Sequence, residues 1–285
     1  MILVFGKTGQ VAKELCAFNN ILALDRYQAD LSNPDACVEA IYKYKPSAVI
    51  NAAAYTSVDK AEEEEQTAIQ INCNAPSAIA YACADLNIPF VQISTDYVFY
   101  GTGEKAFKTN DIINPQNAYG RSKALGEKAI MESNANYVIL RTSWVFSPHG
   151  SNFVKTILRL SDTHKNLNIV EDQIGGPTPA RAIAKACIKI TKQIIDDPKK
   201  SGVYHISGTP DVSWYNFAKA IFNQSDRKVN VRPIQSSEFP TRAIRPLNSR
   251  LDCGTTKLFF NIERPNWLEG LKDTLRDLEI KNEKA

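Results

Sequence analysis

The sequence predicts an α/β fold of the Rossmann type, with a doubly wound parallel sheet followed by a smaller C-terminal α/β region. Short apolar runs alternate with helical patterns through residue 145, as strands alternate with crossover helices in a parallel sheet. A glycine loop follows the first apolar run, and polar side chains follow later runs where open sheets bind ligands. We expect a dinucleotide-binding domain over residues 1–150 and a mainly substrate-binding domain over residues 151–285.

The first strand and the loop after it predict a dinucleotide site. The apolar run of residues 1–5 leads into Gly6 and Gly9, and a helical pattern continues to Phe18. Glycines let the backbone approach a pyrophosphate, and the helix N-terminus offers free N–H groups and the positive end of a dipole. The spacing is G-x-x-G-x-x-A, with Ala12 at the third position. An ordinary tight turn is the alternative, but the position after the first strand favours binding.

The second strand, residues 21–24, ends in Asp25 and Arg26. An acidic residue about 20 residues after the glycine loop binds adenosine ribose hydroxyls, whereas an arginine there pairs with a 2′-phosphate. Both are present, so the choice between NADH and NADPH stays open. Asp30 and Leu31 are placed to flank the adenine, although Asp30 equally suits a helix N-cap or a turn.

Two further strands end in small or hydroxyl-bearing residues. The run of residues 48–50 leads into the small residues 52–54, which allow a dinucleotide to cross the strand end. The run of residues 88–93 ends at Ser94 and Thr95, where a hydroxyl would lie at the carboxyl end of a central strand. Another strand, residues 137–140, precedes Arg141.

Tyr119 and Lys123 are four residues apart in a predicted helix, so they share one face. A phenol has a reference pKa of roughly 10, and we expect the nearby ammonium to lower it. Such a tyrosine can protonate an alkoxide that forms on a reduced carbonyl. A solvated helix surface is the alternative for this common spacing, and the preceding motifs favour the catalytic interpretation.

The second half is less patterned. An amphipathic helix is expected from residues 151–153 to Leu160, and residues 203–206 are expected to return to the main sheet as a strand. Three arginines in a proline-containing stretch suit a diphosphate, with a solvated basic loop as the alternative: Arg242, Arg245 and Arg250. The run of four glutamates at 62–65 predicts the start of a solvated helix.

Bulk composition narrows the function. The 285 residues carry 34 basic and 31 acidic side chains, a net charge of +3 that gives no case for nucleic acid or membrane binding. The six cysteines form no C-x-x-C pair and the three histidines suggest no metal site, so we expect free thiols in a reducing, cytoplasmic location. We find neither a signal peptide nor a membrane-spanning run. A homodimer is compatible with the sequence.

Together these stretches resemble the extended short-chain dehydrogenase/reductase superfamily and, within it, the family of dTDP-4-dehydrorhamnose reductases. The resemblance covers nearly the whole chain and departs at Ala12, where the family usually has glycine. The stretches that carry it are residues 6–10, 51–62, 94–99, 119–123, 141–146, 172–178 and 245–251.

The resemblance implies NADPH or NADH as cofactor, no metal, and reduction of the C4 ketone of a dTDP-sugar substrate, dTDP-4-dehydro-L-rhamnose, for surface polysaccharide. It implies a catalytic trio of Thr95, Tyr119 and Lys123. The cofactor would contact Gly6, Thr8, Gly9, Gln10, Val11, Asp25, Arg26, Asp30, Leu31, Ala52, Ala53, Ala54, Tyr55, Tyr119 and Lys123. The substrate would contact Val58, Asp59, Thr95, Asp96, Tyr97, Trp144, Asn152, Arg245 and Arg250. A core position is equally compatible with Trp144.

Two alternatives remain. The first is another sugar-nucleotide reductase, epimerase or 4,6-dehydratase of the superfamily; a dehydratase usually has Asp-Glu after the threonine, and here Tyr97 follows Asp96. The second is a non-catalytic, regulatory subunit of the same fold, since fold alone does not establish activity. Such subunits commonly lose the tyrosine or the lysine, and this chain keeps both.

Overall fold

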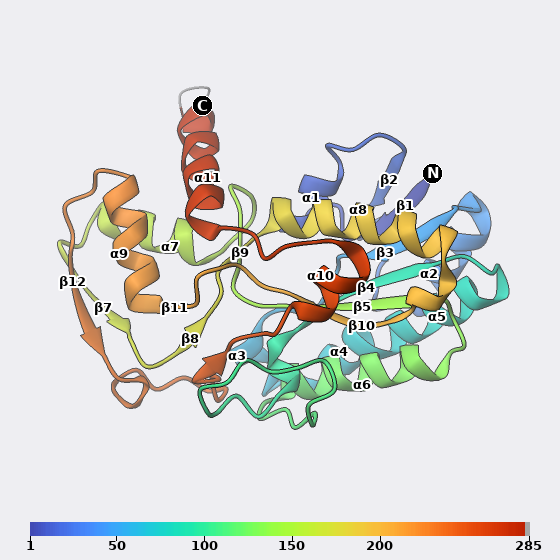
Figure 1. Cartoon of the computed structure of the whole chain (residues 1–285), viewed down its shortest axis with the longest axis horizontal. Helices are drawn as coiled ribbons and strands as arrows, with labels where there is room; N and C mark the ends of the chain where they lie inside the picture. The colour runs from blue at the N-terminus through green and yellow to red at the C-terminus, as the bar shows by residue number, and fades with distance from the viewer. Residues whose placement is uncertain (283–285) are drawn as a thin grey trace.

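The structure, a computed structural model, describes residues 1–282 and is built around one six-stranded parallel sheet (Figure 1). The strand order is β10-β5-β4-β3-β1-β2. The bounds are β1 (Ile2–Phe5), β2 (Ile21–Leu24), β3 (Ala48–Asn51), β4 (Phe90–Thr95), β5 (Tyr137–Thr142) and β10 (Gly202–Ile206). The order reverses between β1 and β3, and such a switch point is where an open α/β sheet binds ligands. The predicted α/β, Rossmann-type fold class is confirmed.

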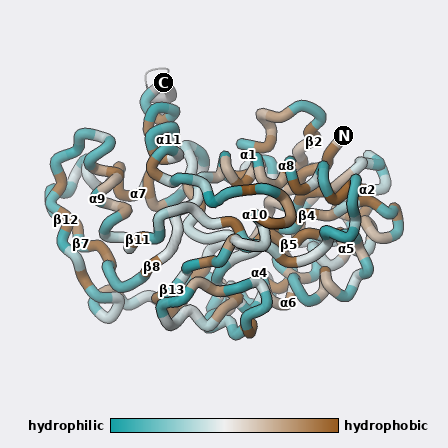
Figure 2. The backbone as a smooth tube through the Cα atoms, in the orientation of Figure 1, coloured by the Kyte–Doolittle hydropathy of each residue, from teal (hydrophilic) through white to brown (hydrophobic). Residues whose placement is uncertain are grey.

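Helices cover both faces of this sheet because side chains alternate along each strand. One face packs Val4, Ile50 and Val91 against α1 (Gln10–Leu15) and α8 (Ala180–Asp196). The other packs Leu3 and Phe5 against α2 (Pro34–Tyr44) and α5 (Ala75–Asp85), with α6 (Ala118–Glu132) on the same side. Figure 2 shows the hydrophobic residues concentrated in the central strands.

A smaller lobe follows the sheet at one side of the molecule (Figure 1). Its helices α7 (Phe153–Ser161), α9 (Trp214–Gln224) and α11 (Trp267–Asn282) enclose a second apolar core. Its short strands form three pairings or sheets: β6 (Val145–Phe146) with β9 (Thr178–Pro179), β7 (Asn166–Val170) with β12 (Asn230–Ile234), and β8 (Ile174–Gly175) between β11 (Val212–Ser213) and β13 (Asn248–Ser249).

The remaining elements are short. They are α3 (Val58–Ala61), α4 (Glu65–Ile69), the π-helical turn η1 (Gln70–Asn74), α10 (Gly254–Phe260) and the 3₁₀ turns η2 (Asp96–Val98), η3 (Pro198–Lys200) and η4 (Ser236–Glu238). Several strands run one or two residues further than the apolar pattern predicts, so β4 includes Thr95 and β5 includes Thr142. The expected strand at 203–206 lies within β10, beside β5.

The acidic run at 62–65 differs from the expected solvated helix. Helix α4 begins at Glu65, the last residue of the run. Glu62 accepts a hydrogen bond from the backbone N–H of Ala118, and Glu65 accepts two from Arg121. These two hydrogen-bonding carboxylates hold the start of α6, while Glu62 and Glu63 remain exposed to solvent as expected.

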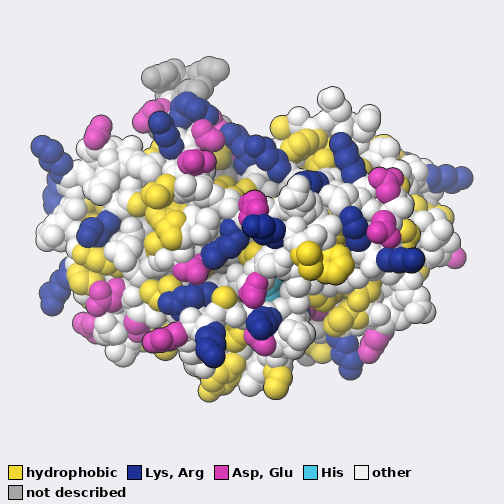
Figure 3. Space-filling model, viewed as in Figure 1, with side chains coloured by type: hydrophobic (Ala, Val, Ile, Leu, Met, Phe, Trp, Pro, Cys, Tyr) yellow, Lys and Arg dark blue, Asp and Glu magenta, His cyan; other side chains and the backbone are white. Residues whose placement is uncertain are grey.

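The surface carries both signs of charge. Figure 3 shows Lys and Arg side chains interspersed with Asp and Glu over the visible face, in keeping with the small net charge. Within residues 1–282, no helix combines the length and apolar character needed to cross a bilayer. The same residues hold no group of three or more His, Cys, Asp or Glu side chains arranged for a metal ion.

Candidate active site

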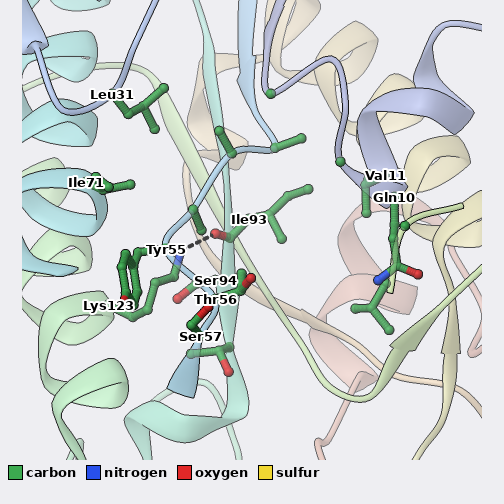
Figure 4. Close-up of a pocket in the computed structure, with 18 of the residues that line it drawn as sticks. Gln10, Val11, Leu31, Tyr55, Thr56, Ser57, Ile71, Ile93, Ser94 and Lys123 are labelled. Carbon is green, nitrogen blue, oxygen red and sulfur yellow. Dashed lines mark hydrogen bonds between the residues drawn. The ribbon is translucent and has the colours of Figure 1, made fainter. Parts of the chain in front are cut away.

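One cleft of about 940 Å³ lies along the carboxyl ends of the strands from β1 to β5. This volume is at the upper end of the usual range for pockets that bind small molecules and cofactors. Every residue expected to contact the cofactor lines it, as do five of those expected to contact substrate: Val58, Thr95, Asp96, Tyr97 and Trp144. Figure 4 shows Leu31, Tyr55 and Ile71 on one side of the cleft and Gln10 and Val11 on the other.

The glycine loop fits a dinucleotide because it leaves backbone exposed where side chains would block it. Gly6 has φ +94°, and a Cβ there would lie 2.8 Å from the Cβ of Ala53. The N–H of Gly9 donates to the carbonyl of Gly6 across the turn, and no side chain caps the first turn of α1. The free N–H groups of that turn are therefore available to phosphate oxygens.

The two residues after β2 line the cleft but also have local partners. The Asp25 carboxylate accepts the backbone N–H groups of Tyr27 and Gln28, which stabilises the turn. The Arg26 guanidinium, with three quarters of its side chain exposed, lies 3.6 Å from the carboxylate of Asp30. Asp30 also accepts the N–H of Ser32, and the N-cap position of α2 is Asn33, so Asp30 is a turn residue rather than a helix cap.

The three residues of the expected catalytic trio all line the cleft. Asn117 caps α6 by accepting the N–H of Gly120, which places Tyr119 in the first turn. A Cβ at Gly120 would lie 2.3 Å from the carbonyl oxygen of Tyr97, so only glycine lets α6 approach η2 this closely. Thr95, at the end of β4, is near enough to the Tyr119 phenol to affect its pKa.

The electrostatics of the trio correct one expectation. Burial raises the pKa of the Tyr119 phenol well above its usual value, and the neighbouring Thr95 side chain only partly opposes this. The Lys123 ammonium donates to the carbonyl of Ile93 at 2.7 Å (Figure 4). Burial lowers its pKa to about 8, while Glu127 opposes the change. The expected lowering of the Tyr119 pKa by Lys123 is therefore wrong for this arrangement, because desolvation dominates.

Asp96 follows Thr95 and is fully enclosed. Its carboxylate accepts the Ser249 hydroxyl at 2.5 Å and the Thr95 hydroxyl at 3.1 Å. Burial raises the pKa of Asp96 to about 6, against the lowering effect of these two hydrogen bonds. Because Ser249 belongs to β13, this carboxylate connects Thr95 to the smaller lobe.

A buried ion pair lies next to the expected trio and was not predicted as part of the site. Its carboxylate, Glu127, acts electrostatically on Lys123. Arg141 and Glu127 are each 1% exposed and hydrogen-bonded at three pairs of atoms, the shortest 2.6 Å. Glu127 also accepts the Ser94 hydroxyl at 2.5 Å. The sequence did contain a signal for Glu127: it lies four residues after Lys123 on α6, so the two side chains share one face of the helix.

A second overlooked residue is Thr142, at the end of β5. It pairs in register with Thr95 on β4 and lines the cleft. Its hydroxyl is buried and has no hydrogen-bond partner among the described residues. A buried hydroxyl of this kind fits a ligand that supplies the missing partner. Other lining residues outside the expected set are Ala29, Thr56, Ser57, Ile71, Ile93, Ser94, Ser143, Val145, Gly150 and Ser151.

Four residues expected at the substrate do not line the cleft. Arg245 is paired with Asp59 and lies 3.4 Å from the hydroxyl of Tyr97, so this pair borders the cleft through Tyr97. The Arg250 guanidinium donates to the side chain of Asn248 at 3.0 Å. Asn152 caps α7 and donates to Gln10 at 2.9 Å, which makes it a structural link to the cofactor side.

The comparisons with known proteins agree with this geometry. The model of the RmlD substrate binding domain matches residues 1–280. A dTDP-4-dehydrorhamnose reductase of Sinorhizobium fredii is 41% identical over 281 residues, covering 95% of each chain. The crystal structure of a dTDP-4-dehydrorhamnose reductase from Clostridium acetobutylicum superposes with a TM-score of 0.90 at 36% identity, covering 98% of this chain and 99% of that one. One from Bacillus anthracis, in complex with NADP, gives 0.90 at 34% identity, covering 97% and 98%.

Proposed function

The chain belongs to the RmlD substrate binding domain family, and on that premise we propose that it is an NAD(P)H-dependent dTDP-4-dehydrorhamnose reductase. It reduces the C4 ketone of dTDP-4-dehydro-L-rhamnose to the alcohol of dTDP-L-rhamnose, a precursor of surface polysaccharide. One observation carries the proposal most directly: Thr95, Tyr119 and Lys123 lie in the same cleft as the glycine loop. A carbonyl-reducing centre thus adjoins a dinucleotide-binding one.

The cofactor fits the cleft on features of this chain. The Gly6–Gly9 turn, the small residues after β3 and the unpartnered Thr142 hydroxyl leave space and hydrogen-bonding groups along the strand ends. When bound, the reduced nicotinamide supplies the hydride that goes to C4 of the sugar. Asp25 and Arg26, which line the cleft after β2, would bind the adenosine ribose, and Lys123 would hold the nicotinamide ribose.

The protein side chains provide the proton and stabilise charge on the carbonyl oxygen. We propose that Thr95 and Tyr119 donate hydrogen bonds to this oxygen, where negative charge develops. Tyr119 then transfers its proton. The Tyr119 phenol is protonated at neutral pH, as an unshifted phenol also is, and this is the form a general acid needs. Because the pKa of Lys123 is about 8, its ammonium remains positively charged in this cleft at neutral pH.

We also propose that the smaller lobe binds the nucleoside diphosphate, with Arg245 and Arg250 as candidate ligands, and that the division falls near residue 150. The six unpaired cysteine thiols support a cytoplasmic location.

The test is NADPH and NADH oxidation by the purified protein with dTDP-4-dehydro-L-rhamnose. dTDP-glucose with NAD⁺ serves as the control for dehydratase activity. We expect consumption of reduced cofactor and formation of dTDP-L-rhamnose in equal amounts, with no dehydration of dTDP-glucose. Dehydration of dTDP-glucose without reduction of the keto sugar would refute the assignment.

A further inference from the structure

Trp144 lines the cleft beside the catalytic residues, in a conformation that its neighbours impose. It follows β5 by two residues and has φ +49°, in the left-handed region that side chains other than glycine rarely adopt. A large residue keeps such a conformation only when its surroundings enforce it. The residues packed around the Trp144 indole therefore determine the shape of the cleft at this point.

Trp214 covers one face of the Trp144 indole. The two ring centroids are 3.6 Å apart and the planes differ by 9°, so the rings stack face to face. Trp214 is the first residue of α9, whose N-cap Ser213 accepts the N–H of Asn216. It also packs against Phe153 of α7, at 4.5 Å between centroids. The smaller lobe thus holds in place a side chain that belongs to the loop after β5.

Gly175 provides the second constraint. A Cβ at this position would lie 2.8 Å from Cε2 and 3.1 Å from Cζ2 of Trp144. Distances below 3.0 Å essentially never occur at real Cβ atoms, so an alanine here would displace the indole or the strand beside it. In the sheet β11–β8–β13, whose three strands are labelled in Figure 2, Gly175 pairs with Val212 and Ser249. Ser249 in turn donates to Asp96, beside Thr95.

We propose that Trp214 and Gly175 are positioning residues that fix the Trp144 indole and thereby the fit of the sugar of the nucleotide-sugar substrate. Neither residue lines the cleft, and both act through Trp144. A fixed aromatic wall suits the apolar face of a deoxysugar, because no rotational freedom is lost when the sugar binds. This inference rests on the proposed function, since it takes the sugar-nucleotide reductase activity as given.

The test compares Trp214→Ala, Trp214→Phe and Gly175→Ala with the wild type. Trp267→Phe is the matched control, because Trp267 belongs to the same apolar cluster but donates its indole N–H to Pro210, away from Trp144. The measurements are KM and kcat for dTDP-4-dehydro-L-rhamnose at saturating NADPH, and the Kd of NADPH. The circular-dichroism couplet of the stacked indoles gives a readout independent of activity, since the chain has only three tryptophans.

We expect Trp214→Ala to abolish the couplet and raise KM roughly 3- to 10-fold, the effect of losing one aromatic pair. Gly175→Ala should weaken the couplet and raise KM in the same direction. Trp214→Phe should restore KM to within about twofold of wild type, and every variant should keep the wild-type Kd for NADPH. Trp267→Phe should keep both the couplet and KM.

Loss of the couplet in Trp214→Ala with an unchanged KM would overturn the inference. The inference would also be overturned if Trp214→Ala and Trp267→Phe raised KM, lowered kcat and weakened NADPH binding to the same extent. That result would reveal a general role in folding. A wild-type protein without reductase activity would instead refute the proposed function.

Discussion

The ammonium of Lys123 donates a hydrogen bond of 2.7 Å to the carbonyl oxygen of Ile93, two residues before Thr95 on β4. This contact ties α6 to the strand at the level of the cleft and sets the position of the lysine. The phenol of Tyr119 lies one turn earlier on the same helix, where the Thr95 side chain affects its pKa. The two side chains therefore have separate partners, which mutations can distinguish.

Tyr119→Phe should remove nearly all turnover and leave cofactor binding intact. The hydroxyl acts on the developing alkoxide, and proton transfer of this type contributes roughly 10²- to 10⁴-fold to the rate. Steady-state kinetics and NADPH titration of the variant provide the measurement. A variant that keeps more than about a tenth of the wild-type rate would show that another group is the general acid.

Lys123→Met should weaken both the rate and NADPH affinity, because the ammonium would hold the nicotinamide ribose. Since burial lowers the Lys123 pKa to about 8, the positive charge is lost as pH rises through that value. NADPH affinity of the wild type should therefore fall above about pH 8, and this limb should be absent from Lys123→Met. An unchanged pH profile together with an unchanged Kd would argue against the dual role.

Arg26→Ala should shift the preference from NADPH toward NADH. The guanidinium can pair with the 2′-phosphate that only NADPH carries, and a charged hydrogen bond is worth about 1.5–3 kcal/mol. The ratio of kcat/KM for the two cofactors should change by about tenfold, since the side chain is largely exposed. Equal losses for both cofactors would show that Arg26 does not distinguish them.

Arg245→Ala should raise KM for the dTDP-sugar by about tenfold to a hundredfold and leave kcat nearly unchanged. A diphosphate is remote from the reacting carbonyl, so its contacts hold ground state and transition state alike. Asp59 competes for the same guanidinium, so Asp59→Asn should lower KM. Arg242→Ala is the control, because Arg242 pairs with the exposed Glu63. If Arg245→Ala and Arg250→Ala both match the wild type, the diphosphate is bound elsewhere.

Features encoded along single segments could be predicted from the sequence. Three such features are local: the strand ends, the glycine loop and the Tyr119–Lys123 spacing. The fold brings residues from all three together in one cleft. Contacts between distant segments could not be predicted. The pairing of Arg245 with Asp59 joins residues 186 positions apart, and the Trp144–Trp214 stack joins the two lobes. Burial was also beyond the sequence, and it reverses the expected direction of the Tyr119 pKa shift.

Asp96→Asn should change how stability depends on pH. Burial raises the Asp96 pKa from 3.8 to about 6 in the folded protein, so the folded state binds the proton more tightly than the unfolded chain. This contribution to stability is fully present below about pH 4 and is lost as pH rises through about 6. At neutral pH, burial of the Asp96 carboxylate lowers the free energy of unfolding by up to roughly 3 kcal/mol compared with its value below about pH 4. One pKa unit is worth about 1.4 kcal/mol.

The measurement is urea unfolding of wild type and Asp96→Asn at several values of pH from 4 to 7.5. The difference in unfolding free energy between the two proteins cancels the other titrating groups. Relative to wild type, the variant should become more stable as pH rises through about 6, because the amide has no charge to bury. Its hydroxyl partners Ser249 and Thr95 can rotate to accept from the amide nitrogen. A difference that stays constant across this range would show that Asp96 titrates normally despite its burial.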